Sequence, residues 1–217
     1  MPPKPKFSKD DIVNAAFEIA RGQGMSALTA REVGKRLGTS SSPIFTVFDD
    51  MEQLRTAVIK KAWNMFYDYM AVAEDYYPSY KMRGIQWVNF SRDEPLLFRA
   101  IFMQHPDERG NFDRVMQIIP FGKEKDVEII MRDYHASRLQ AEQMFRQMWI
   151  YTYGLCVLCA TGVCTFTDEE ITSQLGEIFG GMVYVIKHPG GNTAVIPEKN
   201  DSEASRQNIQ NSPDFRQ

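Results

Sequence analysis

Residues 29–54 read TAREVGKRLGTSSSPIFTVFDDMEQL, and this stretch decides the fold. It predicts two short helices joined by a tight turn, with a third helix beginning directly after them. Thr29 is expected to cap the first helix, and Glu32 to complete a capping box by bonding the Thr29 amide. Gly38 ends this helix because glycine adopts the left-handed conformation without a steric penalty.

The second short helix is expected to begin among the three serines at 40–42, whose hydroxyls can cap it. Pro43 is tolerated in its first turn, where an amide hydrogen would have no helical partner. The side chains predicted on its inner face are apolar: Ile44, Phe45 and Phe48. The serine hydroxyls and Thr46 then point outward. A helix, a glycine-containing turn and a second helix with exposed hydroxyls form the unit that enters a DNA major groove.

A preceding helix completes a small domain. Ser8 can cap a helix from about Lys9 to Gln23, where apolar residues recur at helical spacing. Residues 7–62 resemble the DNA-binding domain of TetR-family transcriptional regulators. The matching residues are spread through the whole segment: Ile12, Ala15, Ala16, Gly24, Leu28, Thr29, Val33, Leu37, Gly38, Ser40, Phe48 and Leu54.

The resemblance implies that this domain contacts DNA through Thr29, Arg31, Thr39, Ser40, Ser41, Ser42, Pro43, Phe45, Thr46 and Met51. The family usually has an aromatic hydroxyl at position 45, Tyr or His near 47, and Lys at 51. Phe45, Val47 and Met51 lack the donors or charge that those residues offer to phosphates. Backbone amides at the start of the next helix still offer a phosphate seat. Asp49 and Asp50 lie beside that seat and would repel a phosphate if they turned toward it.

The distribution of charge agrees with this reading. Residues 1–61 carry ten basic and seven acidic side chains, a net charge of +3; the whole chain is −3, which leaves −6 for the remainder. A basic end on an acidic body favours approach of that end to DNA, although a solvated surface can show so small a surplus by chance. The PPKPK segment at positions 2–6 is either a disordered terminus or an arm that reaches the minor groove.

The rest of the chain predicts an all-α fold. A helical regulatory and dimerisation domain is expected over 63–187, with helices over about 80–92, from Pro95, over about 112–131 with a pause near 120–122, and two long helices after the capping boxes Ser137/Gln140 and Thr167/Glu170. His105–Asn111 is expected to be a polar loop. Residues 188–217 lack apolar residues for a core and predict a flexible tail, or else a short partner-binding segment.

Residues 149–162, WIYTYGLCVLCATG, resemble the penultimate helix of TetR-family regulatory domains. In that family the last two helices pair with their copies in a second subunit as a four-helix bundle, which implies a homodimer. Aromatic and methionine side chains are abundant from Trp63 to Met148. Most are expected to be core, but a surplus of them also suits an adaptable cavity for a small apolar or amphipathic ligand. The candidate cavity residues are Trp63, Phe66, Trp87, Phe90, Met103, Met131 and Met148.

Other chemistry is poorly supported. Three cysteines, an odd number, argue against a disulfide framework and for a reducing cytoplasm. Cys156 and Cys159, one helical turn apart, are interpreted as packing residues, with a metal or redox sensor as the alternative. His135 is interpreted as a surface cap at a helix end. With no phosphate-binding glycine loop, nucleophile elbow, long apolar run or signal-peptide core, the sequence predicts no enzyme, cofactor, metal site or membrane span.

The sequence therefore predicts a ligand-responsive transcriptional regulator, most simply a repressor, that binds a palindromic operator as a homodimer. The rival is a ligand-binding or interaction protein that keeps this scaffold without operator contacts, for which Phe45, Val47 and Met51 are the evidence.

Overall fold

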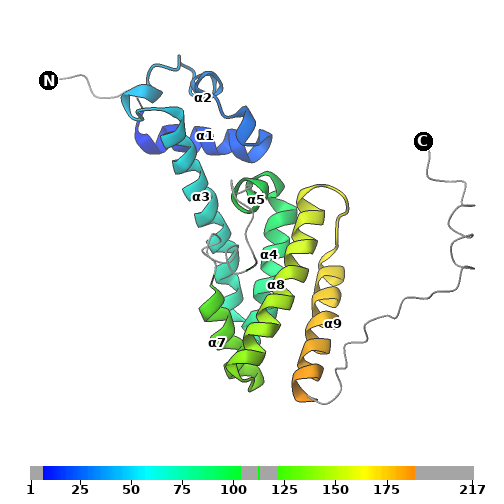
Figure 1. The fold of residues 1–217 in the computed structure, drawn as a ribbon. Helices are drawn as coiled ribbons and strands as arrows, with labels where there is room; N and C mark the ends of the chain where they lie inside the picture. The colour runs from blue at the N-terminus through cyan, green and yellow to red at the C-terminus, as the bar shows by residue number, and fades with distance from the viewer. Residues whose placement is uncertain (1–6, 104–111, 113–121, 189–217) are drawn as a thin grey trace, which may run out of the picture.

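The computed structural model describes residues 7–103, 112 and 122–188, and these form helices and turns without a strand. At one end of the molecule lie α1 (Lys9–Gln23) and α2 (Ala30–Arg36), and α3 (Met51–Ala71) runs from them into a second group of helices (Figure 1). That group contains α4 (Ser79–Asp93), α5 (Pro95–Phe102), α7 (Lys123–Tyr134), α8 (Arg138–Ala160) and α9 (Asp168–Lys187). The all-α prediction is confirmed.

Local capping sets the beginning of α1, as predicted. The Ser8 hydroxyl accepts a hydrogen bond from the Asp11 amide at 3.1 Å, and the Asp11 carboxylate accepts one from the Ser8 amide at 2.9 Å. Arg55 of α3 then ties down the segment that follows α1, because its guanidinium donates to the carbonyls of Met25 (2.8 Å) and Leu28 (2.9 Å). The α1–α2 connection is therefore held against α3 by hydrogen bonds as well as by apolar packing.

Only half of the capping box predicted for α2 is present. The Thr29 hydroxyl accepts from the Glu32 amide at 3.2 Å, but among the described residues the Thr29 amide does not bond the Glu32 side chain. The Glu32 carboxylate lies instead 3.9 Å from Lys35 Nζ. Residues three apart on a helix are neighbours, so an opposite charge at that spacing competes for the carboxylate.

The second short helix is a single 3₁₀ turn, Ile44–Thr46, rather than an α-helix. Its backbone bonds span three residues, with 3.1 Å from the Ile44 amide to the Ser41 carbonyl. No serine caps it, and Pro43 occupies the cap position. The sequence SSSPIFT contains no strong helix former, which explains the short turn. Three residues per turn bury Ile44 and rotate Phe45 outward, so the prediction of an inward Phe45 was wrong: it is 49% exposed.

Helix α3 passes through residue 62, the expected domain boundary, without interruption. Phe66 and Met70 are buried against the second group of helices, and Trp63 packs on Phe66 with a ring-centroid distance of 5.8 Å. Tyr67, in contrast, is 42% exposed. The buried face is centred near Phe66, and the next residue lies about 100° around the helix.

Helix α4 is central, since it contacts α3, α5, α7, α8 and α9. The predicted helices over 80–92 and from Pro95 are confirmed as α4 and α5. A ring cluster joins α3, α4 and α5: Phe66 lies 5.2 Å from Phe90 and 5.0 Å from Phe102, measured between centroids. Edge-to-face packing of this kind fixes ring positions more tightly than aliphatic contact does.

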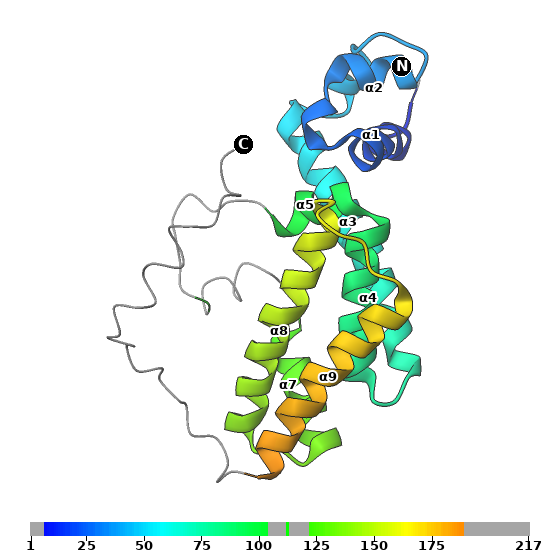
Figure 2. The same cartoon turned by 90° about the vertical axis from the view of Figure 1, so that its right-hand side faces the viewer.

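The two closing helices begin where their capping boxes were predicted. The Ser137 amide donates to Gln140 Oε1 at 2.9 Å, and the Thr167 amide to Glu170 Oε2 at 2.8 Å. Helices α8 and α9 lie side by side (Figure 2). The helix predicted to continue through residue 131 is α7, which extends to Tyr134. The loop predicted at 105–111, most of 112–121 and the tail from 189 lie outside the described residues. Within the ranges that are described, no helix is long and apolar enough to cross a membrane.

Candidate nucleic-acid interface and ligand cavity

Gly34 fixes the geometry of the segment that follows α2. A Cβ built on Gly34 would lie 2.7 Å from the Ser40 carbonyl oxygen and 3.1 Å from the Ser41 nitrogen. The Thr39 amide also donates to the Gly34 carbonyl at 2.9 Å. The turn after α2 is therefore packed backbone against backbone on the helix. Sequence reasoning did not single out Gly34, although an isolated glycine inside a helical pattern is the signal for such a close approach.

This packing presents the candidate DNA-contacting residues of the 39–46 segment. Ser40, Ser42, Phe45 and Thr46 are exposed, as are Thr29 and Arg31 of α2; Thr39, Ser41 and Pro43 are half-buried. The Thr46 hydroxyl donates to the Pro43 carbonyl at 2.7 Å, and Ser40 Oγ accepts from the Ser42 amide at 3.4 Å. With its proton engaged, Thr46 offers lone pairs, which suit an amino group on a base edge.

Two acidic side chains at the start of α3 accept hydrogen bonds from Gln53. Asp50 accepts from the Gln53 amide at 2.8 Å, and the Gln53 side-chain amide donates to Asp49 at 2.6 Å. Met51 is half-buried against the core. A phosphate approaching the helix start would therefore meet Asp50 already occupying the amide that it would bind. Of the expected contacts, Met51 is the one that the fold turns toward the core.

A small cavity of about 30 Å³ lies among α4, α7, α8 and α9. Two of the predicted cavity residues, Trp87 and Met148, line it. The others lie elsewhere: Phe66 and Phe90 are fully buried in the ring cluster, Trp63 borders that cluster, Met131 packs half-buried on α7, and Met103 lines a hollow beside α1 and α5. Ligand cavities usually measure about 300–1,000 Å³. The described cavity therefore has room for a single small group.

A buried ion pair forms the polar side of this cavity. Arg83 Nε lies 2.5 Å from Asp126 Oδ1, and both side chains are less than a tenth exposed. Burial raises the pKa of Asp126 to about 6, because the loss of hydration outweighs the attraction and hydrogen bonding of Arg83. Gly122 packs against the pair, since a Cβ there would lie 3.0 Å from Arg83 Nη2. The sequence reasoning missed this pair, because the partners are far apart in the chain and neither carries a local signal.

A second charged contact joins α1 to the junction between α4 and α5. Arg21 of α1 makes a fork to Glu94 between α4 and α5: its Nε lies 2.8 Å from Oε2, and its Nη2 bonds Oε1. Glu94 is only 7% exposed in its side chain. The hydrogen bond to Glu94 is the main reason that the pKa of Arg21 is raised. A bidentate pair of this type fixes orientation as well as distance.

The outer face of α8 and α9 carries exposed apolar side chains. Leu139 and Ile150 of α8 are 67% and 51% exposed, and Tyr184 of α9 is 64% exposed. Between the two helices runs a groove lined by residues such as Met144, Ile178 and Met182. Large exposed apolar patches mark a contact with another macromolecule more often than isolated exposed residues do.

The cysteines occupy packing positions. Cys156 and Cys159 are buried, and burial raises the pKa of both thiols. Within the described residues, no group of three or more Cys, His, Asp or Glu side chains could hold a metal ion. His135 is exposed at the C-terminal end of α7 with a left-handed φ of 54°, consistent with a surface helix cap.

Comparison with known proteins bears on residues 12–58, which match the family model for bacterial regulatory proteins of the tetR family. The fold resembles a TetR-like transcriptional regulator from Rhodococcus sp. RHA1, with a TM-score of 0.59, 10% identity, and coverage of 84% of this chain and 96% of that one. It also resembles another transcriptional regulator from Rhodococcus sp. Rha1, with a TM-score of 0.56, 13% identity, and coverage of 82% and 97%. At such identities the likeness concerns the fold. No curated protein matches the chain.

Proposed function

We propose that this chain, which carries the DNA-binding domain of the tetR family of bacterial regulatory proteins on a TetR-like fold, is a ligand-responsive repressor that binds a palindromic operator as a homodimer. DNA-binding transcription regulation is what membership of this family implies. The observation that carries the proposal is the segment from Thr39 to Thr46, packed against Gly34 with the hydroxyl-bearing residues Ser40, Ser42 and Thr46 exposed. A regulator of this kind acts by binding rather than catalysis, in the cytoplasm where the DNA lies.

Dimerisation through α8 and α9 supplies the operator symmetry. Two copies joined by this face would place their Thr39–Thr46 segments on successive major grooves, roughly 34 Å apart. The exposed Ile150 and Tyr184 support this interface. Ile150→Arg should convert the dimer to a monomer in sedimentation velocity and weaken operator binding. Tyr77→Arg is the matched control, because Tyr77 is 80% exposed but lies before α4, away from that face. If the wild-type protein sediments as a monomer, the proposed homodimer is refuted.

A ligand would act through the cavity among α4, α7, α8 and α9. Because the cavity has room for only a small group, a ligand must bind a form in which these helices have separated. Its effect on DNA binding equals its difference in affinity between the two forms, so tight binding alone would release nothing. The Arg21–Glu94 contact is the proposed mechanical link, since it joins α1 to the α4–α5 junction.

The experiment that tests operator binding uses DNA from upstream of the gene and a scrambled duplex of the same composition, at several salt concentrations. Ser41→Ala with Thr46→Ala should reduce the preference for the natural duplex by at least about tenfold, because each base-edge contact discriminates strongly. Thr165→Ala, exposed in the α8–α9 connection, is the control. No preference in the wild type, or an unchanged preference in the double variant, would refute operator reading.

The rival function is ligand binding or protein interaction without an operator. The acidic start of α3, with Asp49 and Asp50 bonded to Gln53, is the observation that favours it. The two functions differ in salt dependence. Operator binding that neutralises phosphates weakens steeply as salt rises, whereas residual DNA binding with a flat salt dependence would support the rival.

A further inference from the structure

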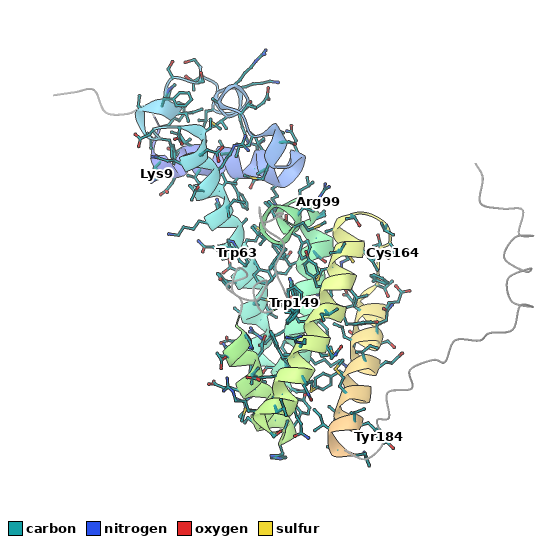
Figure 3. The ribbon with its side chains drawn as sticks, in the orientation of Figure 1. Lys9, Trp63, Arg99, Trp149, Cys164 and Tyr184 are labelled. Atoms are coloured by element: carbon teal, nitrogen blue, oxygen red, sulfur yellow. The ribbon has the colours of Figure 1, made fainter. Side chains whose placement is uncertain are left out.

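The cavity among α4, α7, α8 and α9 has one polar side and otherwise aromatic and aliphatic walls. Trp87, Phe145, Met148, Leu175 and Phe179 provide the apolar lining. Trp149, also in the lining, lies on α8 in the middle of the helical group (Figure 3). Such walls accept a hydrocarbon or an aromatic ring, and a methionine among them adapts its shape to what enters.

The polar side carries a surplus of positive charge. Among the described residues, the lining contains Lys81 and Arg83 of α4 and one acid, Asp126 of α7. The lining residues of α8 and α9 are uncharged. Lys125, the other cation near Asp126, is paired with Glu74 on the surface. An anion that entered would therefore meet two cations, whereas a cation that entered would compete with the buried Arg83 for Asp126.

Burial disfavours the charged form of Asp126, the carboxylate that pairs with Arg83. Asp126 is buried, and its raised pKa reports that burial outweighs the stabilisation that Arg83 gives its charged form. A second carboxylate could take its place against Arg83 while Asp126 accepts a proton from solvent. That exchange keeps the charge of the cavity unchanged, so the ligand need not bring a new charge into the interior.

Trp149 supplies a further donor. Its side chain is nine-tenths buried, and within the described residues its indole Nε1 has no hydrogen-bond acceptor. Thr152, also buried and in the lining, adds a hydroxyl. An unpaired buried donor is costly unless a partner arrives. A volume of about 30 Å³ exceeds the roughly 10–15 Å³ that one water molecule needs, so the cavity has room for a headgroup and not for a whole ligand.

We propose that the effector is an amphipathic monocarboxylate, whose carboxylate displaces Asp126 from Arg83 and whose aliphatic or aromatic body separates the apolar walls of the cavity. This inference rests on the proposed function in placing the effector site in the helical domain. It adds the chemical class of the ligand and the residue that recognises it. Arg83 is the recognition residue, because a guanidinium binds a carboxylate through two parallel donors.

The test is calorimetric titration of the full chain with straight-chain acids of six to twelve carbons and 4-phenylbutanoate, each beside its primary amide and primary amine. At least one acid should bind, and at least about tenfold more tightly than its amide, because hydrogen bonds to a charged partner are the stronger kind. Absence of binding by every acid, or equal or tighter binding of the matching amide or amine, overturns the inference.

Variants of Arg83 and Asp126 test whether this ion pair recognises the carboxylate of the ligand. Arg83→Met with Asp126→Leu replaces the pair by apolar groups and should keep the fold while abolishing the preference for acid over amide. Asp126→Asn removes the competing carboxylate and should tighten acid binding. Trp149→Phe should weaken it. A preference that survives in the double variant, with its melting temperature retained, refutes recognition by Arg83.

The same titration separates this inference from the proposed function. If an acid binds with the expected preference but leaves operator affinity unchanged, the ligand class stands and ligand-controlled DNA release fails. If operator is released by a neutral or cationic compound that binds in the cavity while the acids do not, the regulator stands and the carboxylate inference fails.

Discussion

Replacement of Gly34 by alanine tests the packing that presents the segment proposed to contact DNA. The added Cβ would lie 2.7 Å from the Ser40 carbonyl oxygen and 2.8 Å from its carbon. An ordinary contact begins at 3.4 Å, so α2 and the turn must separate by about 0.7 Å, the difference between 3.4 and 2.7 Å. Both atoms belong to the backbone, so no side-chain rotation relieves the overlap.

The cost follows from that displacement. The hydrogen bond from the Thr39 amide to the Gly34 carbonyl, now 2.9 Å, would stretch beyond bonding range. Losing it costs about 1 kcal/mol, and the overpacking adds about 1–3 kcal/mol. The better helix propensity of alanine returns at most about 1 kcal/mol. We expect a net destabilisation of about 1–3 kcal/mol and a lower melting temperature, by roughly 2–4 °C for each kcal/mol.

The assay is urea unfolding of Gly34→Ala and Gly22→Ala together with operator titration. Gly22 lies in the last turn of α1 with nothing within 4 Å of an added Cβ, so its replacement should be neutral or slightly stabilising. Operator affinity should fall for Gly34→Ala alone, since the displaced segment carries the exposed hydroxyls. Equal stability of the two variants, or undiminished DNA binding by Gly34→Ala, would refute the reasoning.

Three further outcomes are expected. Arg21→Met should destabilise the protein in urea unfolding more than Glu94→Gln does, because Arg21→Met leaves the buried Glu94 carboxylate unpaired. The amide of Glu94→Gln keeps the shape of the side chain and can still accept a hydrogen bond from Arg21. The reverse order would contradict the Arg21–Glu94 contact. Burial raises the pKa of Asp126 from its ordinary value of 3.8 to about 6, so its contribution to stability is full below about pH 4 and is lost as pH rises through about 6; Asp126→Asn should remove this part of the pH profile of unfolding free energy. Of the three thiols, only Cys164 should react quickly with a disulfide reagent in the folded protein, because the two α8 thiols are buried with raised pKa values; rapid release of three equivalents would show otherwise.

Helix boundaries were predictable where a cap is encoded within four residues. Ser8, Ser137 and Thr167 begin helices at the expected positions, because each cap is a contact between near neighbours. Prediction failed where two local contacts competed. Glu32 faces Lys35 rather than completing its capping box, and Phe45 turns outward because its segment forms a 3₁₀ turn and not an α-helix.

The amino-acid sequence by itself determined the all-α fold, the DNA-binding unit at the N-terminus and the two closing helices, since periodicity and caps act over a few residues. Only the tertiary structure decided that the cavity is small, that Trp87 and Met148 line it, and that Arg83 meets Asp126 on its polar side. Those relations join α4, α7 and α8, and depend on how whole helices pack. No short stretch of sequence records which face of one helix will meet another.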